Sequence, residues 1–278
     1  MKNVKIFNEY YLVVGNNLDI LLPDSEKTTI VCFENNFSEE KYYLNLLNKE
    51  EVDKVIVIGT KPMRSFGKKL IRANTIKESF LKNSERIIFI INTDIDEDVL
   101  IPLVQLFRIA KKRGIKVGID NLIGYSYETT EILMKSLEAL LQEDTYKEYE
   151  VIYDYICDEL DRKFADNSIC QFKDDRCVAN RKYKDKAKIM GCCYSFKYNG
   201  LYFSDVKLCE HQKDRKCDVK CLGCKLFTCD YLRNHGIRFT LNKMPIALAF
   251  FTKKQRELLR TTFFVSKETV IETVMKGK

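Results

Sequence analysis

Cysteine is the residue whose number and spacing point most directly to chemistry in this sequence. The chain has 278 residues and 11 cysteines, and all of them except Cys32 and Cys157 lie between positions 170 and 229. Thiolates hold zinc ions and iron–sulfur clusters, and a gap of roughly two to four residues lets a turn bring two sulfurs to one ion. We therefore predict a zinc ion or an iron–sulfur cluster with these ligands: Cys170, Cys177, Cys192, Cys193, Cys209, Cys217, Cys221, Cys224 and Cys229.

The spacing also indicates how these thiolates could be divided between two sites. The last four cysteines suit one tetrahedral site: Cys217, Cys221, Cys224 and Cys229. Adjacent side chains diverge in an extended segment, so Cys192 and Cys193 would serve separate centres, or one of them would be spare. One division that fits assembles the second site from Cys170, Cys177, Cys209 and either member of that adjacent pair. His211 and His235 are either additional ligands or ordinary turn residues.

Disulfides and reduced thiols are the alternatives to a metal, and the expected compartment bears on them. The apolar run Tyr10 to Val14 is interrupted at Gly15, so no secretory signal is predicted. Met244 to Phe251 falls short of the roughly 20 residues that span a bilayer. We therefore expect a cytoplasmic protein without a membrane partner. A reducing cytoplasm keeps thiols available to metals and disfavours stable disulfides, whereas structural or redox-sensing thiols stay open as an alternative.

The order of cysteines resembles that of a known family. An adjacent pair, Cys192 and Cys193, is followed by a single Cys209, and then by cysteines at 217, 224 and 229 with Phe227 shortly before the last. This pattern is similar to the YkgJ-type cysteine-cluster family, whose members are described as chelators of zinc or iron. The resemblance covers about sixty residues. It implies metal chelation and does not define a reaction.

The first half of the chain has the pattern of a parallel sheet covered by helices. Short apolar runs without strict alternation occur at 29–33, 54–58, 86–91 and 115–119, with helical segments between them. Such runs are typical of strands buried on both faces. We predict an α/β fold in which a Rossmann-like, mostly parallel sheet (residues 1–165) precedes a small irregular cysteine-rich metal-binding domain with C-terminal helices (residues 166–278).

Several individual elements can be predicted in more detail. Tyr10–Val14 and Leu18–Leu22 should form a hairpin around Gly15, and a helical stretch should run from Gly59 to about Lys82. Acidic residues at the start and basic residues at the end indicate a helix over 98–113 that stops at Gly114. Residues 126–165 should be helical with a break near 144–145, and two further helices are expected at 255–264 and 266–275.

Potential ligand sites in this first half lie at the turns that follow its strands. None of them is a dinucleotide-binding or P-loop motif, so the ligand of the α/β domain stays unidentified. Thr60, Lys61 and Ser65 form either a phosphate site or a plain surface turn. The element order from Val52 to Asp158 and the sequence 110–119 resemble the tubulin and FtsZ type of core, although the acidic segment 92–97 replaces its phosphate loop. The acidic side chains there could bind a hard cation or cap a helix: Asp94, Asp96, Glu97 and Asp98.

Charge favours a second hypothesis for the cysteine-rich half. Residues 151–278 contain 26 Lys and Arg against 16 Asp and Glu, a net charge of +10, whereas residues 1–150 contain 21 against 24, or −3. The alternative function is nucleic-acid binding by a zinc-stabilised basic domain. Its basic residues would be Arg181, Lys182, Lys184, Lys186 and Lys188, and its stacking aromatics Tyr194, Phe196, Tyr198, Tyr202 and Phe203. No motif identifies a protein partner or a hydrolase, so an enzymatic activity is left open.

Overall fold

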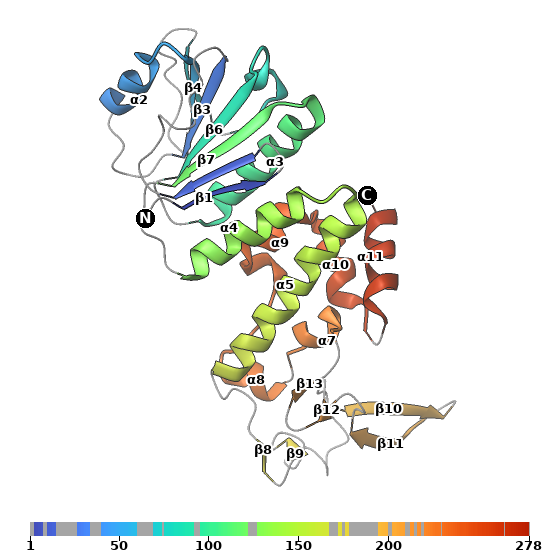
Figure 1. The fold of residues 1–278 in the computed structure, drawn as a ribbon. Coiled ribbons are helices and arrows are strands. Elements are labelled where there is room, and N and C mark those ends of the chain that lie inside the picture. Colours follow the sequence, from blue (N-terminus) through green and yellow to red (C-terminus); the bar gives the residue numbers. More distant parts are fainter. Residues whose placement is uncertain are drawn as a thin grey trace. The chain divides into compact units, whose positions relative to one another are not determined.

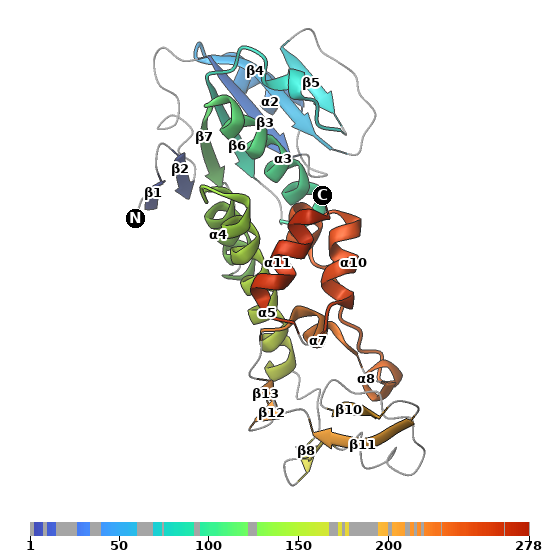
Figure 2. The same ribbon diagram turned by 90° about the vertical axis from the view of Figure 1, so that its right-hand side faces the viewer.

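The chain forms two compact units, Met1–Leu140 (unit 1) and Leu141–Lys278 (unit 2) (Figures 1 and 2). A boundary at residue 165 was expected from the sequence, whereas in the structure the long helix before that position belongs to unit 2. The computed structural model describes all residues except 1–2, 8–9, 15–26, 34–39, 60–68, 74, 92–94, 122–126, 167–171, 174–175, 178–193, 200–201, 209–211, 214–215, 218–219, 229, 264 and 278.

Unit 1 contains a single sheet of seven strands in the order β1-β2-β7-β6-β3-β4-β5. All neighbouring strands are parallel except β1 and β2, which are antiparallel. The α/β class predicted from the sequence is therefore confirmed. The strands are β1 (Asn3–Phe7), β2 (Tyr10–Val14), β3 (Thr28–Phe33), β4 (Val52–Ile58), β5 (Leu70–Ala73), β6 (Arg86–Ile91) and β7 (Lys116–Asn121).

Helices cover both faces of this sheet, which explains why its central strands β3 and β6 are mainly apolar. Every residue of β3 and β6 is buried. On one face, Tyr43 and Leu46 of α2 (Glu40–Leu47) join Ile30 and Cys32 of β3 in one core cluster. Helix α2 lies in the connection from β3 to β4, and α3 (Glu97–Arg113) lies in the connection from β6 to β7. In the strand order, these two connections move toward opposite edges of the sheet. Because such crossovers are right-handed, the two helices lie on opposite faces, as Figure 1 shows.

The ends of α3 follow the signals that the sequence carries. The Asp96 side chain accepts hydrogen bonds from the backbone N–H groups of Asp98 and Val99 at 2.9 and 3.1 Å. Gly114 adopts the left-handed conformation (φ 66°) that a helix C-cap requires and that glycine accepts without strain. Unit 1 also contains a 3₁₀ helix, η1 (Glu78–Leu81), and α4 (Tyr127–Leu140).

Two predicted elements of unit 1 were wrong. Residues 10–14 do not pair with 18–22, because β2 already has β1 and β7 on its two sides and a strand has only two edges; residues 18–22 themselves lie outside the described residues. The helix predicted to reach Lys82 is instead interrupted by β5, whose Leu70 is fully buried beside β4. Burial in the sheet outweighed the helical spacing of this short segment.

Unit 2 is organised around α5 (Thr145–Asp166), which packs against α7 (Leu222–Leu226), α9 (Pro245–Phe250) and α11 (Lys267–Lys276). The buried Gln255 amide joins three elements, since its Nε2 donates to the Tyr149 hydroxyl and to the Val274 carbonyl, both at 3.1 Å. No helix in the described part of the chain has the length and apolar character needed to cross a membrane. The remaining elements are α8 (Asp230–Asn234), η3 (Leu241–Lys243), α10 (Lys253–Thr261), β8 (Phe172–Lys173), β9 (Arg176–Cys177), β10 (Tyr194–Asn199), β11 (Tyr202–Leu208), β12 (Gln212–Lys213) and β13 (Lys216–Cys217).

Candidate metal centre

The structure places four of the nine predicted ligands. Cys221 and Cys224 lie at the start of α7 and within it, and both are buried, with 1% and 8% of their surface exposed. Cys177 ends β9 and Cys217 ends β13, and only their backbones are described. The other five lie outside the described residues: Cys170, Cys192, Cys193, Cys209 and Cys229.

Helix α7 is held against the end of α10 through the carbonyl of Thr262. The Cys221 thiol donates to this oxygen at 3.7 Å. Gly223 approaches the same atom so closely that a Cβ at position 223 would lie 2.1 Å from it. The two cysteines therefore lie on a short helix whose position is fixed by a backbone contact that only glycine permits.

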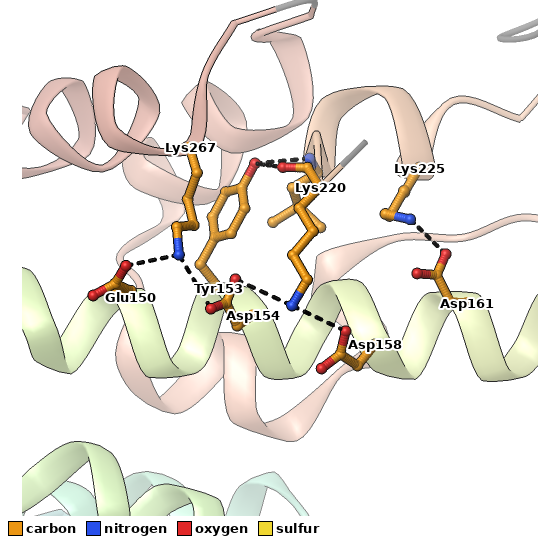
Figure 3. Close-up of polar contacts among 9 residues, drawn as sticks. Glu150, Tyr153, Asp154, Asp158, Asp161, Lys220, Lys225 and Lys267 are labelled. Carbon is orange, nitrogen blue, oxygen red and sulfur yellow. Dashed lines mark hydrogen bonds and ion pairs between the residues drawn. The ribbon is translucent and has the colours of Figure 1, made fainter. Parts of the chain in front are cut away.

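Tyr153 of α5 joins this helix to the centre of unit 2. Its hydroxyl donates to the Lys220 carbonyl at 3.1 Å and accepts from the Leu222 N–H at 2.9 Å, as Figure 3 shows. Burial raises the pKa of Tyr153; the Leu222 N–H opposes the shift, and Cys157, Cys221 and Cys224 add to it. Three thiols thus lie near one buried phenol.

Cys157 is the member of this group that the sequence analysis missed. It is fully buried on the inner face of α5, one turn after Tyr153. Burial raises the pKa of the Cys157 thiol to about 12, although the positive charge of Lys225 acts in the opposite direction. The only available signal was its helical spacing from Tyr153, because its distance in sequence from Cys221 matches no ligand motif.

A row of acidic side chains along α5 is paired with lysines from the segments around α7 and α11 (Figure 3). Lys267 lies 2.7 Å from Glu150 and 3.2 Å from Asp154. Lys220 lies 3.6 Å from Asp154 and 3.3 Å from Asp158, and Lys225 pairs with Asp161. Partial burial lowers the pKa of Lys220, but Asp154 and Asp158 outweigh it, so the net shift is upward. The Lys220 and Lys225 pairs fix the segment that carries Cys221 and Cys224 to α5, and the Lys267 pairs fix the start of α11 to it.

Among the residues that the structure describes, no three Cys, His, Asp or Glu side chains are grouped so that they could hold a metal ion. Cys32, Cys157, Cys221 and Cys224 carry thiols and form no disulfide. Cys221 and Cys224 are packed in the helical core of unit 2, and most of the predicted ligands lie outside the described residues. The predicted metal centre accordingly stays a prediction.

No family model and no curated protein matches this sequence. The likenesses to the YkgJ-type cysteine cluster and to the tubulin and FtsZ core therefore rest on the residues quoted for them alone.

The structure describes some residues of the other predicted sites. Asp96 caps α3, so the helix-cap interpretation of the acidic segment is confirmed for this residue. His235 is exposed just after α8, whereas His211, Asp94, the segment Thr60 to Ser65 and the basic residues 181–188 lie outside the described residues. The backbones of the aromatic residues from Tyr194 to Phe203 fall in or beside the β10–β11 ribbon.

Unit 1 contains a second group of polar side chains, which the sequence analysis did not single out. Cys32 of β3, Ile90 of β6 and Asp120 of β7 stand in one row across the sheet, near the carboxyl ends of the strands. Asp120 is 1% exposed. Burial raises the pKa of Tyr42 on α2, and Cys32, Asp120 and Tyr43 add to the shift. The phenol, the thiol and the carboxyl group are therefore neighbours beneath α2.

Proposed function

We propose that the chain is a metal-binding protein whose cysteine-rich part, between residues 166 and 229, holds zinc or an iron–sulfur cluster. The observation that carries this proposal is the size of two hairpins that end in cysteine. β8–β9 and β12–β13 have two residues in each strand. An isolated two-stranded hairpin is at best marginally stable in water, even when it is longer. A metal that cross-links the cysteines supplies the missing stabilisation.

The same proposal accounts for the composition of this part of the chain. Its sequence between 166 and 193 is rich in Lys, Asp and Cys and lacks the apolar periodicity of a hydrophobic core. Small domains of this kind usually depend on metals or disulfides. A cytoplasmic location favours the metal, because reduced thiols stay available there. The role of the metal is structural or redox.

Elemental analysis of protein purified without oxygen tests the proposal. We expect zinc, or iron with sulfide, in whole-number stoichiometry. Removal of the metal by a chelator should abolish hydrogen-exchange protection in the two hairpins and leave β3 and β6 protected, because those strands are buried in unit 1. A Cys32→Ala variant serves as the control, since this thiol lies in the other unit and should not affect metal content. A preparation with neither metal contradicts the proposal.

We further propose that unit 1 is a Rossmann-like domain that binds a nucleotide at the carboxyl ends of its strands. The supporting observation is the strand order: from β3 the chain proceeds outward to β4 and β5, then returns to β6 and continues to β7 on the other side. In open α/β sheets, ligands bind outside the carboxyl ends where the order reverses, here between β3 and β6. The buried Asp120 and the partly buried Tyr42 lie near this edge.

A hydrogen-exchange footprint with a panel of adenine, guanine and flavin nucleotides tests this second proposal. We expect one of them to stabilise the chain thermally and to slow exchange at the ends of β3 and β6, near Phe33 and Ile91. The control region is the hollow of about 320 Å³ at the opposite edge, which is lined by Ser84, Glu85, Arg113, Gly114, Ile115 and Lys116. Protection confined to that hollow, or no stabilisation by any nucleotide, contradicts the proposal.

A further inference from the structure

Positive and negative charge are carried by different elements of unit 2. Helix α5 contains three basic and seven acidic residues, a net charge of 3 − 7 = −4. The stretch from α8 to the end of α10, residues 230–263, contains seven basic and two acidic residues, a net charge of 7 − 2 = +5. Desolvation raises the pKa of Tyr146 in α5, and nearby carboxylates, including Glu268 and Glu272 of α11, add to the shift. These acids of α11 therefore lie near α5, and the excess of positive charge belongs to the stretch that ends with α10.

Three basic residues of α10 form a stripe along one side of the helix. Lys253, Arg256 and Arg260 are three and four residues apart, so they are neighbours on the helix surface. Arg256 joins this basic stripe to η3, because its Nε donates to the Asn242 side chain at 2.9 Å. Its Nη1 donates to the Phe251 carbonyl at 2.5 Å. The two contacts orient the guanidinium group in advance, which lowers the entropic cost of binding an anion.

The stability of α10 alone does not account for these charges. Lys253 and Lys254 occupy the first turn, where the helix dipole favours acidic residues, and that turn contains none. One turn later, Glu257 is held by both arms of Arg260: Nε donates to Oε2 at 3.1 Å, and Nη2 donates to Oε1. A guanidinium group binds phosphate in the same bidentate way. Both side chains of this pair are 59% exposed, and such a pair is weak, so a phosphate group can replace Glu257 on Arg260.

An exposed aromatic ring follows the stripe in the sequence. Phe263 lies three residues after Arg260 and is 39% exposed. Among the described residues, it is one of two large hydrophobic side chains that are exposed, and the other, Leu44, belongs to unit 1. The Phe263 ring meets that of Phe227 at a centroid distance of 6.2 Å and an interplanar angle of 79°. This contact holds the Phe263 ring in place while part of it stays open to solvent, as a stacking platform for a base requires.

We propose that single-stranded nucleic acid binds to this surface, with its phosphates on the basic stripe and a base stacked on Phe263. This activity goes beyond the metal and nucleotide binding proposed above, and its residues are distinct from the basic residues 181–188. Cationic groups beside an exposed aromatic ring are the arrangement that binds single strands. A duplex fits less well, because its bases are already stacked on one another. An acidic protein would use the charges and leave the ring without a role.

Binding of a labelled oligothymidylate to the full chain, followed by fluorescence anisotropy at several salt concentrations, tests the proposal. We expect the affinity to fall steeply with salt. Lys253→Gln and Arg260→Gln should each weaken binding and reduce the slope of log K against log salt by about 0.7, the value for one phosphate contact to a single strand. Lys163→Gln is the matched control, since Lys163 is an exposed lysine of α5 paired with Glu159. An equal loss in the control would overturn the proposal.

Two further variants separate the proposed surface from a general effect of charge or folding. Glu257→Gln should bind the oligonucleotide several-fold more tightly, because Arg260 is released to the phosphates, and a misfolded variant would not gain affinity. Phe263→Leu should weaken binding about tenfold, whereas Phe263→Tyr should retain it, because tyrosine keeps the stacking face. Unchanged affinity in Phe263→Leu overturns the proposal. So does equally tight binding of a duplex, of polyglutamate or of vesicles of anionic lipid.

Discussion

Replacement of Gly223 by alanine is expected to lower the free energy of unfolding of unit 2 by about 1–3 kcal/mol, the range for a substitution that forces backbone to move in a packed core. The added Cβ would lie 2.1 Å from the carbonyl oxygen of Thr262 and 2.9 Å from its carbonyl carbon. Backbone atoms cannot rotate away as a side chain can. Helix α7 must therefore move, and Leu222 and Cys224 must leave their buried positions with it.

Urea unfolding followed by far-UV circular dichroism measures this loss, and thiol labelling locates it. We expect Cys221 and Cys224, now buried, to react faster with a thiol reagent in the variant. Gly277→Ala is the matched control, because its Cβ would be crowded only by the flexible end of the Leu258 side chain at 3.0 Å, while the carbonyl oxygens of Thr273 and Val274 would lie at an ordinary contact distance of 3.6 Å. Equal stability of the Gly223 and Gly277 variants would show that α7 is not fixed by the Thr262 contact.

The sheet of unit 1 could be predicted from the sequence because its central strands are buried on both faces. Residues 30–33 and 87–91 are continuous apolar runs, and they lie in two fully buried strands, β3 and β6. The limits of α3 followed from Asp96 and Gly114, whose side-chain and backbone preferences act locally. The partner of residues 10–14 could not be predicted, because an apolar run does not specify which strand it will pair with.

The candidate centre was predictable only as a set of thiols. Ligand spacing identified Cys221 and Cys224, since it depends on nearby residues in the sequence. Their burial beside Tyr153 and Cys157 depends on packing between α5 and α7, which are separated by more than fifty residues in the sequence. The hairpins β8–β9 and β12–β13 were also missed, because strands of two residues in a Lys- and Asp-rich sequence are too short to show an apolar alternation.

The ion pair between Lys225 and Asp161 should respond very differently to the loss of each partner. The Lys225 side chain is 3% exposed, whereas that of Asp161 is 50% exposed. Asp161→Asn would leave an ammonium group buried without its carboxylate, and we expect the free energy of unfolding to fall by about 1–3 kcal/mol. This is below the full cost of breaking a buried pair, because Asp161 faces solvent.

Lys225→Met should change stability by no more than about 1 kcal/mol, because methionine fills the space of the lysine stem and Asp161 can be hydrated in its absence. The double variant should resemble Lys225→Met. Urea unfolding of the three variants at one ionic strength measures the difference. If Lys225→Met were as unstable as Asp161→Asn, the prediction would be wrong: the Asp161 carboxylate, and not the buried Lys225 ammonium, would depend on the ion pair for its stability.

Labelling of Cys157 gives this prediction an independent readout. Lys225 lowers the pKa of the Cys157 thiol, which burial raises to about 12. In Lys225→Met the lysine charge is absent, so the pKa of the Cys157 thiol should rise further. A smaller fraction of this thiol is then ionised, and Cys157 should be alkylated more slowly than in the wild type when unit 2 opens equally often. In Asp161→Asn the positive charge remains and the fold is weaker, so the same thiol should be alkylated faster. Because the two variants are expected to change the rate in opposite directions, a general loosening of unit 2 cannot produce both results.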